Sequence, residues 1–182
     1  MTHFAFAHAD TLGKAADYRL PPMDIQTLPD GGFSMDAPFP ALATPHEPPG
    51  KLQSAHHRHQ RCWLPNFTTV RQSFTDGDER VLLHVPSPNT RTTCTVFWSL
   101  AISPGFRGPA PDAQIDFAIR VLAEDRLMCE NQIPAEVPIN PARGGWGVLV
   151  MPGDTLANTF QKCLRRWLQT EAPHLTAGEQ SP

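Results

Sequence analysis

The stretch TTCTVFWSLAIS, residues 92–103, carries the strongest β-strand signal in the chain because β-branched and aromatic residues dominate it. It is followed by DAQIDFAIRVLAEDRLMCENQ, residues 112–132, whose length and apolar spacing predict a helix. A second helix is predicted over residues 154–170. Asp112 and Asp154 stand where N-caps of these helices are expected.

Other strand signals precede this stretch. Residues 23–36 hold an Asp-Gly-Gly turn between two extended arms, residues 62–74 are aromatic and β-branched, and residues 80–86 are short and apolar. Strands first and helices last predict an α+β domain. We expect a helix-grip fold, in which a curved antiparallel sheet wraps around a long C-terminal helix and encloses a cavity.

Composition limits both the size and the partners of this domain. The chain has 182 residues, 40% of them hydrophobic and 18% charged, which suits one globular domain with a sizeable core. We expect the domain over residues 1–171 and a disordered polar tail over residues 172–182. A net charge of −3 argues against nucleic acid or an anionic membrane as partner.

The sequence contains neither a signal-peptide pattern at its start nor an apolar run of the length that a membrane helix needs. A cytoplasmic location is therefore expected. The four cysteines are far apart in sequence and form no CxxC or CxH pair, which predicts reduced, mostly buried thiols. They are Cys62, Cys94, Cys129 and Cys163.

In the first predicted helix, an advance of about 100° per residue aligns an apolar stripe. This stripe consists of Ile115, Ile119, Leu122 and Cys129. Asp125 lies at its margin, roughly 60° from Leu122, and a carboxylate directed at a protein interior needs a partner. An ion pair with Arg126 or exposure to solvent is the alternative interpretation.

Two histidines, His3 and His8, open the chain. On an ideal helix their spacing corresponds to about 140°, so they share no face unless the helix is interrupted. Exposure to solvent near the terminus is the simpler explanation of each histidine alone. Together with Asp125, however, they supply two imidazoles and one carboxylate, the facial triad that holds non-haem Fe(II).

Chemistry at such an iron site needs a dry, apolar pocket for a small organic molecule. Its candidate lining residues are Phe4, Phe6, Phe67, Phe97 and Trp98. In the stretch HHRHQRC, residues 56–62, His57 and His59 alternate and are predicted to point to one face of a strand. They would line the cavity, bind a second metal or, as we favour, lie exposed, whereas Cys62 is expected to be buried or to face the pocket.

At this point the chain resembles a known family. The opening THFAFAHADTLG is similar to the segment with the two iron-binding histidines in the catalytic domain of Rieske-type aromatic oxygenases, especially vanillate O-demethylase and dicamba monooxygenase. VLAEDRLMCENQIP resembles the helix that supplies their third ligand, so that Asp125 matches the carboxylate and Glu130 and Gln132 complete the motif. The strand run TTCTVFWSLAIS and the helix DTLANTFQKCLRRWL also look like elements of that domain.

The resemblance implies a START-like helix-grip domain in which His3, His8 and Asp125 bind Fe(II) and the carboxylate of Asp125 serves catalysis. Electrons would come from NAD(P)H through a reductase and the Rieske [2Fe–2S] cluster of a partner domain or subunit. With O2, the iron would then hydroxylate or oxidatively demethylate a small aromatic substrate, as a monooxygenase or a dioxygenase of aromatic catabolism. Relatives of this type assemble as homotrimers.

The chain departs from this family pattern because the cysteine and histidine pairs of a Rieske cluster are absent from it. We therefore expect a truncated product or a start assigned too far downstream. Two alternatives to an oxygenase stay open. One is a helix-grip module that binds a hydrophobic ligand without redox chemistry, and the other is a non-catalytic subunit that assembles with full-length partners.

Overall fold

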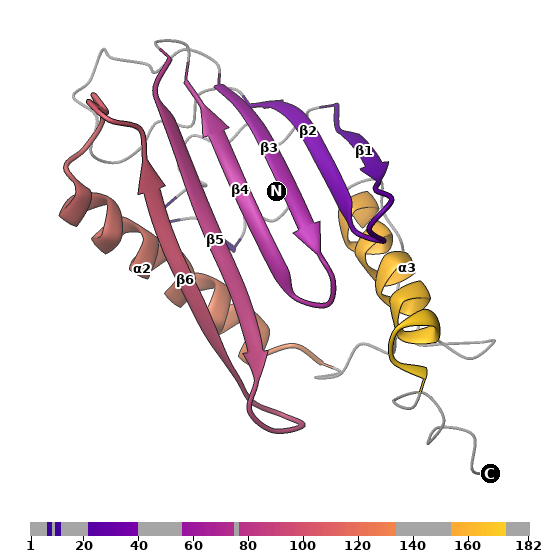
Figure 1. Cartoon of the computed structure of the whole chain (residues 1–182). Coiled ribbons are helices and arrows are strands. Elements are labelled where there is room, and N and C mark those ends of the chain that lie inside the picture. Colours follow the sequence, from indigo (N-terminus) through magenta and orange to yellow (C-terminus); the bar gives the residue numbers. More distant parts are fainter. Residues whose placement is uncertain are drawn as a thin grey trace.

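A computed structural model of the chain describes residues 7–8, 10–11, 22–39, 56–74, 77–133 and 154–173. Within this part, six antiparallel strands lie in the sheet in chain order (Figure 1). They are β1 (Asp24–Thr27), β2 (Phe33–Phe39), β3 (His56–Trp63), β4 (Phe67–Ser73), β5 (Glu79–Pro88) and β6 (Cys94–Ile102). Helices α2 (Pro111–Glu130) and α3 (Thr155–Thr170) follow the sheet. The predicted α+β class, with its antiparallel sheet and helix-grip arrangement, is confirmed.

The turn between β1 and β2 is the predicted Asp-Gly-Gly turn. Gly31 has a φ of 82°, a backbone conformation that side chains with a Cβ rarely adopt. At Gly32 a Cβ would lie 2.3 Å from the carbonyl oxygen of Cys62 on β3, and its N–H donates to Asp30 Oδ1 at 3.1 Å. Both glycines are therefore required for β2 to return alongside its neighbours.

Residues 62–74, expected as one strand-like stretch, contain a turn. β3 ends at Trp63, the cis peptide bond Leu64–Pro65 follows, and β4 begins at Phe67. The proline has no N–H to donate to a neighbouring strand, which explains why the ladder stops there.

The helix starts agree in part with the prediction. α2 begins with Pro111 after an N-cap at Ala110, and Asp112 lies in the first turn. The prediction that Asp112 is the N-cap is therefore wrong. Proline suits this first position because the N–H that it lacks would have had no partner inside the helix. Asp154 is the N-cap of α3 as expected.

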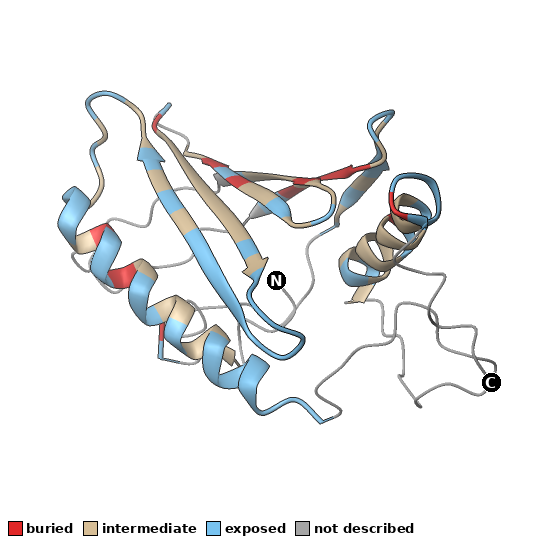
Figure 2. Ribbon diagram, turned by 60° about the horizontal axis from the view of Figure 1, so that its bottom comes forward, coloured by how far each residue is buried: buried red, intermediate tan, exposed pale blue. Residues whose placement is uncertain are grey.

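Both helices cover the same, concave face of the sheet, at opposite ends of it. α2 runs beneath β5 and β6, and α3 lies at the β1 and β2 edge (Figure 2). The apolar core is centred under α3, where Phe33, Cys62 and Cys163 are buried together. Residues Ile25, Leu64, Leu156 and Phe160 pack against this cluster. The C-terminal helix thus closes one end of the face, while α2 stands over the other end.

The inward face of α2 is not the predicted apolar stripe. Ile115 and Ile119 are exposed by 40% and 52%, and Cys129 is exposed as well. Gln114 and Phe117 are the buried residues of the helix, and Leu122 alone of the stripe faces inward. The prediction of this stripe was wrong because apolar residues occur on both sides of α2. Periodicity therefore could not identify which side of the helix faces the sheet.

All four cysteines are free thiols, in agreement with the sequence prediction. Cys62 and Cys163 are buried, whereas Cys94 and Cys129 are exposed. The expectation of mostly buried thiols therefore holds for two of them only. Burial raises the pKa of the Cys62 thiol, which keeps this group protonated at neutral pH.

Candidate active site

Four side chains meet at α2, two from the start of the described chain and two from the helix itself. The imidazole of His8 lies with Nε2 3.2 Å from Asp125 Oδ1 and with Nδ1 2.8 Å from Glu124 Oε2. The hydroxyl of Thr11 also donates to Glu124 Oε2. His8 is 1% exposed and Thr11 is 4% exposed, so the histidine is buried, whereas the Asp125 side chain that it contacts is 43% exposed. The sequence prediction placed His8 and Asp125 at one site, and here they are in contact.

The two carboxylates control the protonation of His8. Burial by itself would disfavour the charged imidazole, but the hydrogen bonds that the ring donates to Asp125 and Glu124 outweigh burial and raise the pKa of His8 above its ordinary value. Glu124 accepts at Nδ1, which fixes the ring orientation and directs Nε2 toward Asp125. A histidine held in this way has the form of a metal-binding imidazole oriented by a second carboxylate.

A cavity of about 300 Å³ opens beside His8 and Asp125. Its walls come from the four neighbouring strands β3 to β6, from α2, and from Leu156 at the start of α3. The apolar lining residues include Val70, Leu82, Leu100, Phe117, Val121 and Leu122. The polar ones include Arg58, Gln60, Thr68, Gln72, Arg80, His84 and Gln114. A cavity of this volume, mostly apolar with a few polar groups, suits a small aromatic molecule.

The register of the sheet explains which side chains reach the cavity. Successive residues of a strand point to opposite faces of the sheet. On β5, the residues that point into the cavity are Arg80, Leu82 and His84. His84 lies near the Asp125 end, where burial lowers the pKa of its imidazole despite the attraction of that carboxylate. At the other end Arg80 donates to Gln114 Oε1 of α2 at 3.5 Å.

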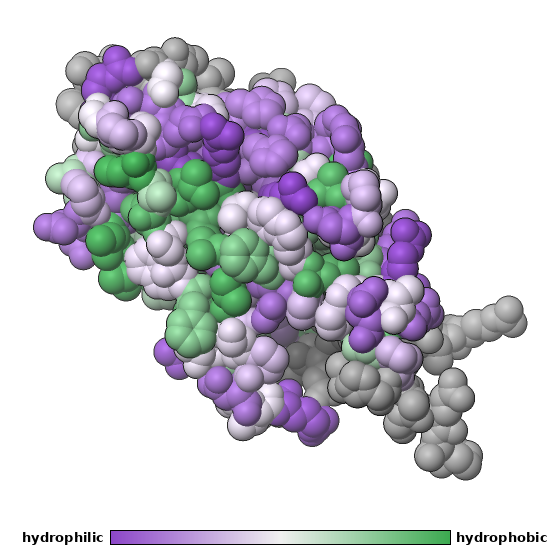
Figure 3. Space-filling model, in the orientation of Figure 1, coloured by the Kyte–Doolittle hydropathy of each residue, from purple (hydrophilic) through white to green (hydrophobic). Residues whose placement is uncertain are grey.

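The aromatic residues that were predicted to line the pocket do not line the cavity where the structure describes them. His3, Phe4 and Phe6 lie outside the described residues. Phe67 packs edge-on against Trp63, with ring centroids 5.1 Å apart, and Phe97 is 62% exposed opposite Val85. Phe97 belongs to the face away from α2, where hydrophobic residues gather over β5 and β6 (Figure 3).

Trp98 is on the cavity side of β6, paired with His84, but like Phe67 and Phe97 it is not among the side chains that line the cavity. The lining comes instead from smaller aliphatic side chains and from Phe117 of α2. None of these residues was selected from the sequence except Leu122.

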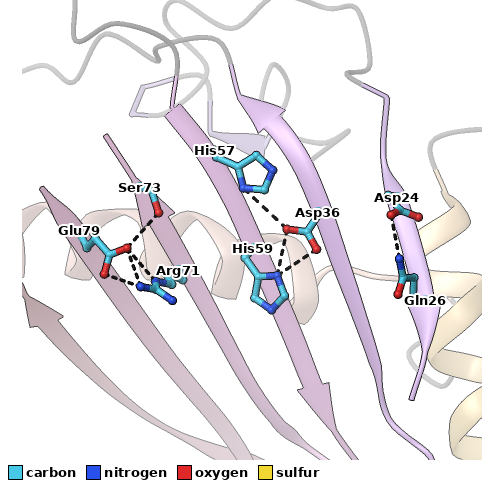
Figure 4. A network of polar contacts seen from close by, with 8 residues as sticks. All are labelled: Asp24, Gln26, Asp36, His57, His59, Arg71, Ser73 and Glu79. Atoms are coloured by element: carbon cyan, nitrogen blue, oxygen red, sulfur yellow. Dashed lines mark hydrogen bonds and ion pairs between the residues drawn. The ribbon is translucent and has the colours of Figure 1, made fainter. Parts of the chain in front are cut away.

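The alternating histidines of β3 lie on one face of the strand, as their spacing predicts, and this is the outer face of the sheet. Nδ1 of His59 is 3.0 Å from Asp36 Oδ1, and Nδ1 of His57 is 3.7 Å from the same atom (Figure 4). Their side chains are 40% and 53% exposed. Of the three interpretations of these histidines, exposure on the strand is the one that the structure supports.

Within the described residues, no group of three histidine, cysteine or acidic side chains is arranged to hold a metal ion. The pair His8 and Asp125 nevertheless fits two positions of a metal site. Two donor atoms bound at about 2.1 Å and at a right angle to each other lie about 3.0 Å apart, close to the 3.2 Å between Nε2 and Oδ1. The chemistry of this donor pair, one nitrogen and one carboxylate oxygen facing a cavity, is that of a facial triad with its third ligand still to be added.

A family model described as the vanillate O-demethylase oxygenase C-terminal domain matches residues 1–170 of the chain. The chain belongs to this family. The resemblance to the catalytic domain of Rieske-type oxygenases, drawn from the two histidines and from the helix with Asp125, is therefore confirmed, and with it an oxidoreductase family. No curated protein matches the chain.

Solved structures of similar fold come from Pseudomonas putida CBB5. A mutant of NdmA with theobromine is 22% identical and superposes with a TM-score of 0.68, and NdmB is also 22% identical, with a TM-score of 0.66. The matches cover 95% and 88% of this chain but only 45% and 41% of the relatives. The chain thus spans less than half the length of these proteins, and at this identity they establish the fold alone.

In the described part of the chain, neither helix is long and apolar enough to cross a membrane.

The polar lining of the cavity was missed by sequence reasoning. Arg58 and Gln60 lie on β3, where residues 56–61 are all polar, so alternation does not show which of them face inward. For Gln72 and Arg80, near the ends of their strands, the sequence likewise does not show which face of the sheet they point to. Glu124 was not selected from the sequence, because its contact with His8 is a tertiary contact between distant segments.

Proposed function

We propose that residues 1–171 form the catalytic unit of an oxygenase that binds Fe(II) through His3, His8 and Asp125. In this proposal it uses O2 to hydroxylate or oxidatively demethylate a small aromatic substrate. Electrons come from NAD(P)H through a reductase and the Rieske [2Fe–2S] centre of a partner, in the cytoplasm, and the assembly is a homotrimer. The observation that carries the proposal is the contact of His8 Nε2 with Asp125 at the cavity wall.

Each residue of the site has a stated part in this chemistry. The ligand atoms would be Nε2 of His8 and a carboxylate oxygen of Asp125, with the imidazole of His3 as the third donor. Glu124 orients His8 through Nδ1 and keeps Nε2 available. Bound Fe(II) supplies the redox chemistry with dioxygen, which protein side chains lack.

The residues that line the cavity support the same proposal. Leu82, Phe117 and Leu122 present apolar surface on which an aromatic ring can pack, and they keep water away from it. The polar groups of the wall then fix how the ring is turned. A pocket built from rigid sheet and helix holds a bound substrate in one position relative to Asp125.

The test is an anaerobic Fe(II) titration of the purified chain beside its Asp125→Ala and His8→Ala variants. One bound equivalent is expected for the wild type, and both substitutions should abolish saturable binding because each removes a ligand. Asp116→Ala is the matched control, since Asp116 is an exposed carboxylate on the same helix. Equal binding by the Asp125→Ala variant, or none by the wild type, contradicts the proposed iron site.

A second experiment tests the proposed reaction. Dioxygen consumption is followed after a reduced Rieske protein and 4-methoxybenzoate are added to the iron-loaded chain. Substrate-dependent consumption with release of formaldehyde supports an oxidative demethylase. Binding of an aromatic molecule by a chain that takes up no iron would favour the alternative, a ligand-binding helix-grip domain, which the mostly apolar cavity would also serve.

A further inference from the structure

Two adjacent carboxylates of α2 face the same histidine. Glu124 Oε2 lies 2.8 Å from Nδ1 of His8, and Asp125 Oδ1 lies 3.2 Å from Nε2. Either carboxylate could bind a divalent cation such as Fe(II), so residue type alone does not decide which of them does. Their surroundings differ, because Asp125 lines the cavity and Glu124 is not among its described lining residues. A contact that acts on only one of the two carboxylates would therefore separate their roles.

Thr11 makes such a contact. Its hydroxyl donates to Oε2 of Glu124, the same oxygen atom that Nδ1 of His8 reaches. The backbone N–H of Thr11 donates to the carbonyl oxygen of His8 at 3.0 Å, so the two residues belong to one turn of the chain. This turn thus holds one carboxylate oxygen through two side chains. A threonine suits the position because its branched Cβ leaves the side chain few rotamers.

The contact between Thr11 and Glu124 is shielded from water. Thr11 is 4% exposed, and the side chain of Glu124 is 19% exposed, against 43% for that of Asp125. A buried hydroxyl needs a hydrogen-bond partner. If Glu124 turned toward the cavity, the hydroxyl of Thr11 and Nδ1 of His8 would both lose Oε2 as their acceptor. Glu124 is therefore held on the Nδ1 side of the imidazole.

A carboxylate that is fixed at Nδ1 determines which nitrogen of His8 can bind a metal ion. In a neutral imidazole one nitrogen carries the proton and the other offers its lone pair. The contact of Nδ1 with Glu124 is shorter and better shielded than that of Nε2 with Asp125, which favours the proton on Nδ1. The lone pair is then on Nε2, beside Asp125 and the cavity.

We propose that Thr11 is a positioning residue of the candidate active site. Its hydroxyl holds Glu124 in place at Nδ1, so that Nε2 is the nitrogen of His8 that is presented to a metal ion beside Asp125. Thr11 acts only through Glu124 and is not itself a ligand. This inference rests on the proposed function only where it concerns Fe(II), because the contacts among Thr11, Glu124 and His8 require no metal.

The first experiment determines the tautomer of His8 in the metal-free chain. NMR of the chain labelled with ¹⁵N-histidine, at a pH where the ring is neutral, shows which ring nitrogen carries the proton, and a spectrum of His8→Gln identifies the signals. The wild type should carry the proton on Nδ1. Thr11→Val exchanges the hydroxyl for a methyl group and should shift the proton toward Nε2, whereas the matched control Thr11→Ser keeps the hydroxyl and should resemble the wild type. A wild-type proton on Nε2, or no shift in Thr11→Val, overturns the inference.

The second experiment measures Fe(II) affinity by anaerobic competition with a chelator. Thr11→Val should weaken binding by about 3–10-fold, less than loss of the orienting carboxylate itself, and Thr11→Ser should restore most of the affinity. In a chain that already carries Glu124→Ala, Thr11→Val should have no further effect, because Thr11 acts through Glu124. An equal loss in both backgrounds would reveal a general structural effect and contradict the inference.

Thr11→Ala covers the case in which Thr11→Val does not fold, since it removes the same hydroxyl without placing a methyl group against the carboxylate. Circular dichroism compares the folds. If the wild type binds no Fe(II) but the tautomer responds to loss of the hydroxyl, the proposed oxygenase function fails and the positioning role of Thr11 stands. If the wild type binds Fe(II) and neither the tautomer nor the affinity responds, the role of Thr11 fails and the iron site stands.

Discussion

The concave face of the sheet is covered by one helix at each end, and the two ends are filled differently. Under α3, Phe33 and Cys62 of the sheet meet Cys163 of the helix, and the space between them is closed. Under α2, the same sheet face presents Arg58 and Arg80 to a cavity of about 300 Å³. One face of one sheet thus serves as a packed core at one end and as the wall of a cavity at the other.

The difference follows from the kind of side chain in each row of the sheet. Phe33 and Cys62 are register partners and both apolar, so burying them stabilises the fold. Gln72 and Arg80, partners in another row, are polar and long, and they need bonds to one another or to a ligand. A row of this kind prevents close packing of the helix and keeps a cavity open. Stability should therefore depend on the α3 end and recognition on the α2 end.

The largest expected effect tests the packed end. Phe33→Ala should lower the free energy of unfolding by about 3–5 kcal/mol, because a buried aromatic ring is lost and a cavity remains. Phe33 is 2% exposed, whereas the control Phe97→Ala removes a ring that is 62% exposed and should change the value by about 0.5 kcal/mol or less. Urea unfolding followed by circular dichroism measures both. Similar losses for the two variants would show that the core is not centred under α3.

A smaller effect is expected at the hollow end, and it concerns metal affinity. Glu124→Ala should weaken Fe(II) binding by about 10–100-fold, because His8 loses the partner that orients its ring, while one equivalent still binds. Glu124→Gln keeps an oxygen acceptor for Nδ1 and should restore most of the affinity. Anaerobic titration with a competing chelator gives both constants. An unchanged affinity in Glu124→Ala would remove this carboxylate from the site.

The sequence predicted the positions of the strands and helices better than it predicted which side chains face the cavity. The strand run at residues 92–103 and the two helices were placed within about two residues, because length, β-branched content and helix-start residues are local signals. His8 and Asp125 were chosen from residue types and from the family resemblance, and the structure brings them into contact. The oriented pair is thus the part of the site that the sequence could predict.

The inner face of the sheet and helix was harder to predict. All residues from 56 to 61 are polar, and α2 carries apolar residues on both sides, with Ile119 exposed and Phe117 buried. Periodicity needs a contrast between faces, and neither element provides it. Phe67 and Phe97 were selected as lining residues for their aromatic character, yet they point to the other face. Which face turns inward is decided by pairing between strands, which single residues do not reveal.

The smallest expected effect lies on the outer face, away from both ends. Arg71 donates to both carboxylate oxygens of Glu79, and this bond holds the pKa of Glu79 below its ordinary value of about 4.5. A carboxyl whose pKa is lower in the folded state stabilises the fold above its unfolded pKa, and the contribution is lost as the pH falls through the folded value. Glu79→Gln should therefore unfold slightly more easily than the wild type at pH 7 and low salt. The difference should shrink as the pH falls below about 4.5 and vanish once the carboxyl is protonated in the folded state as well. It should also vanish in 1 M salt, since exposed ion pairs are screened. Thermal unfolding across this pH range measures it, and a difference that persists at low pH would assign the effect to packing and not to charge.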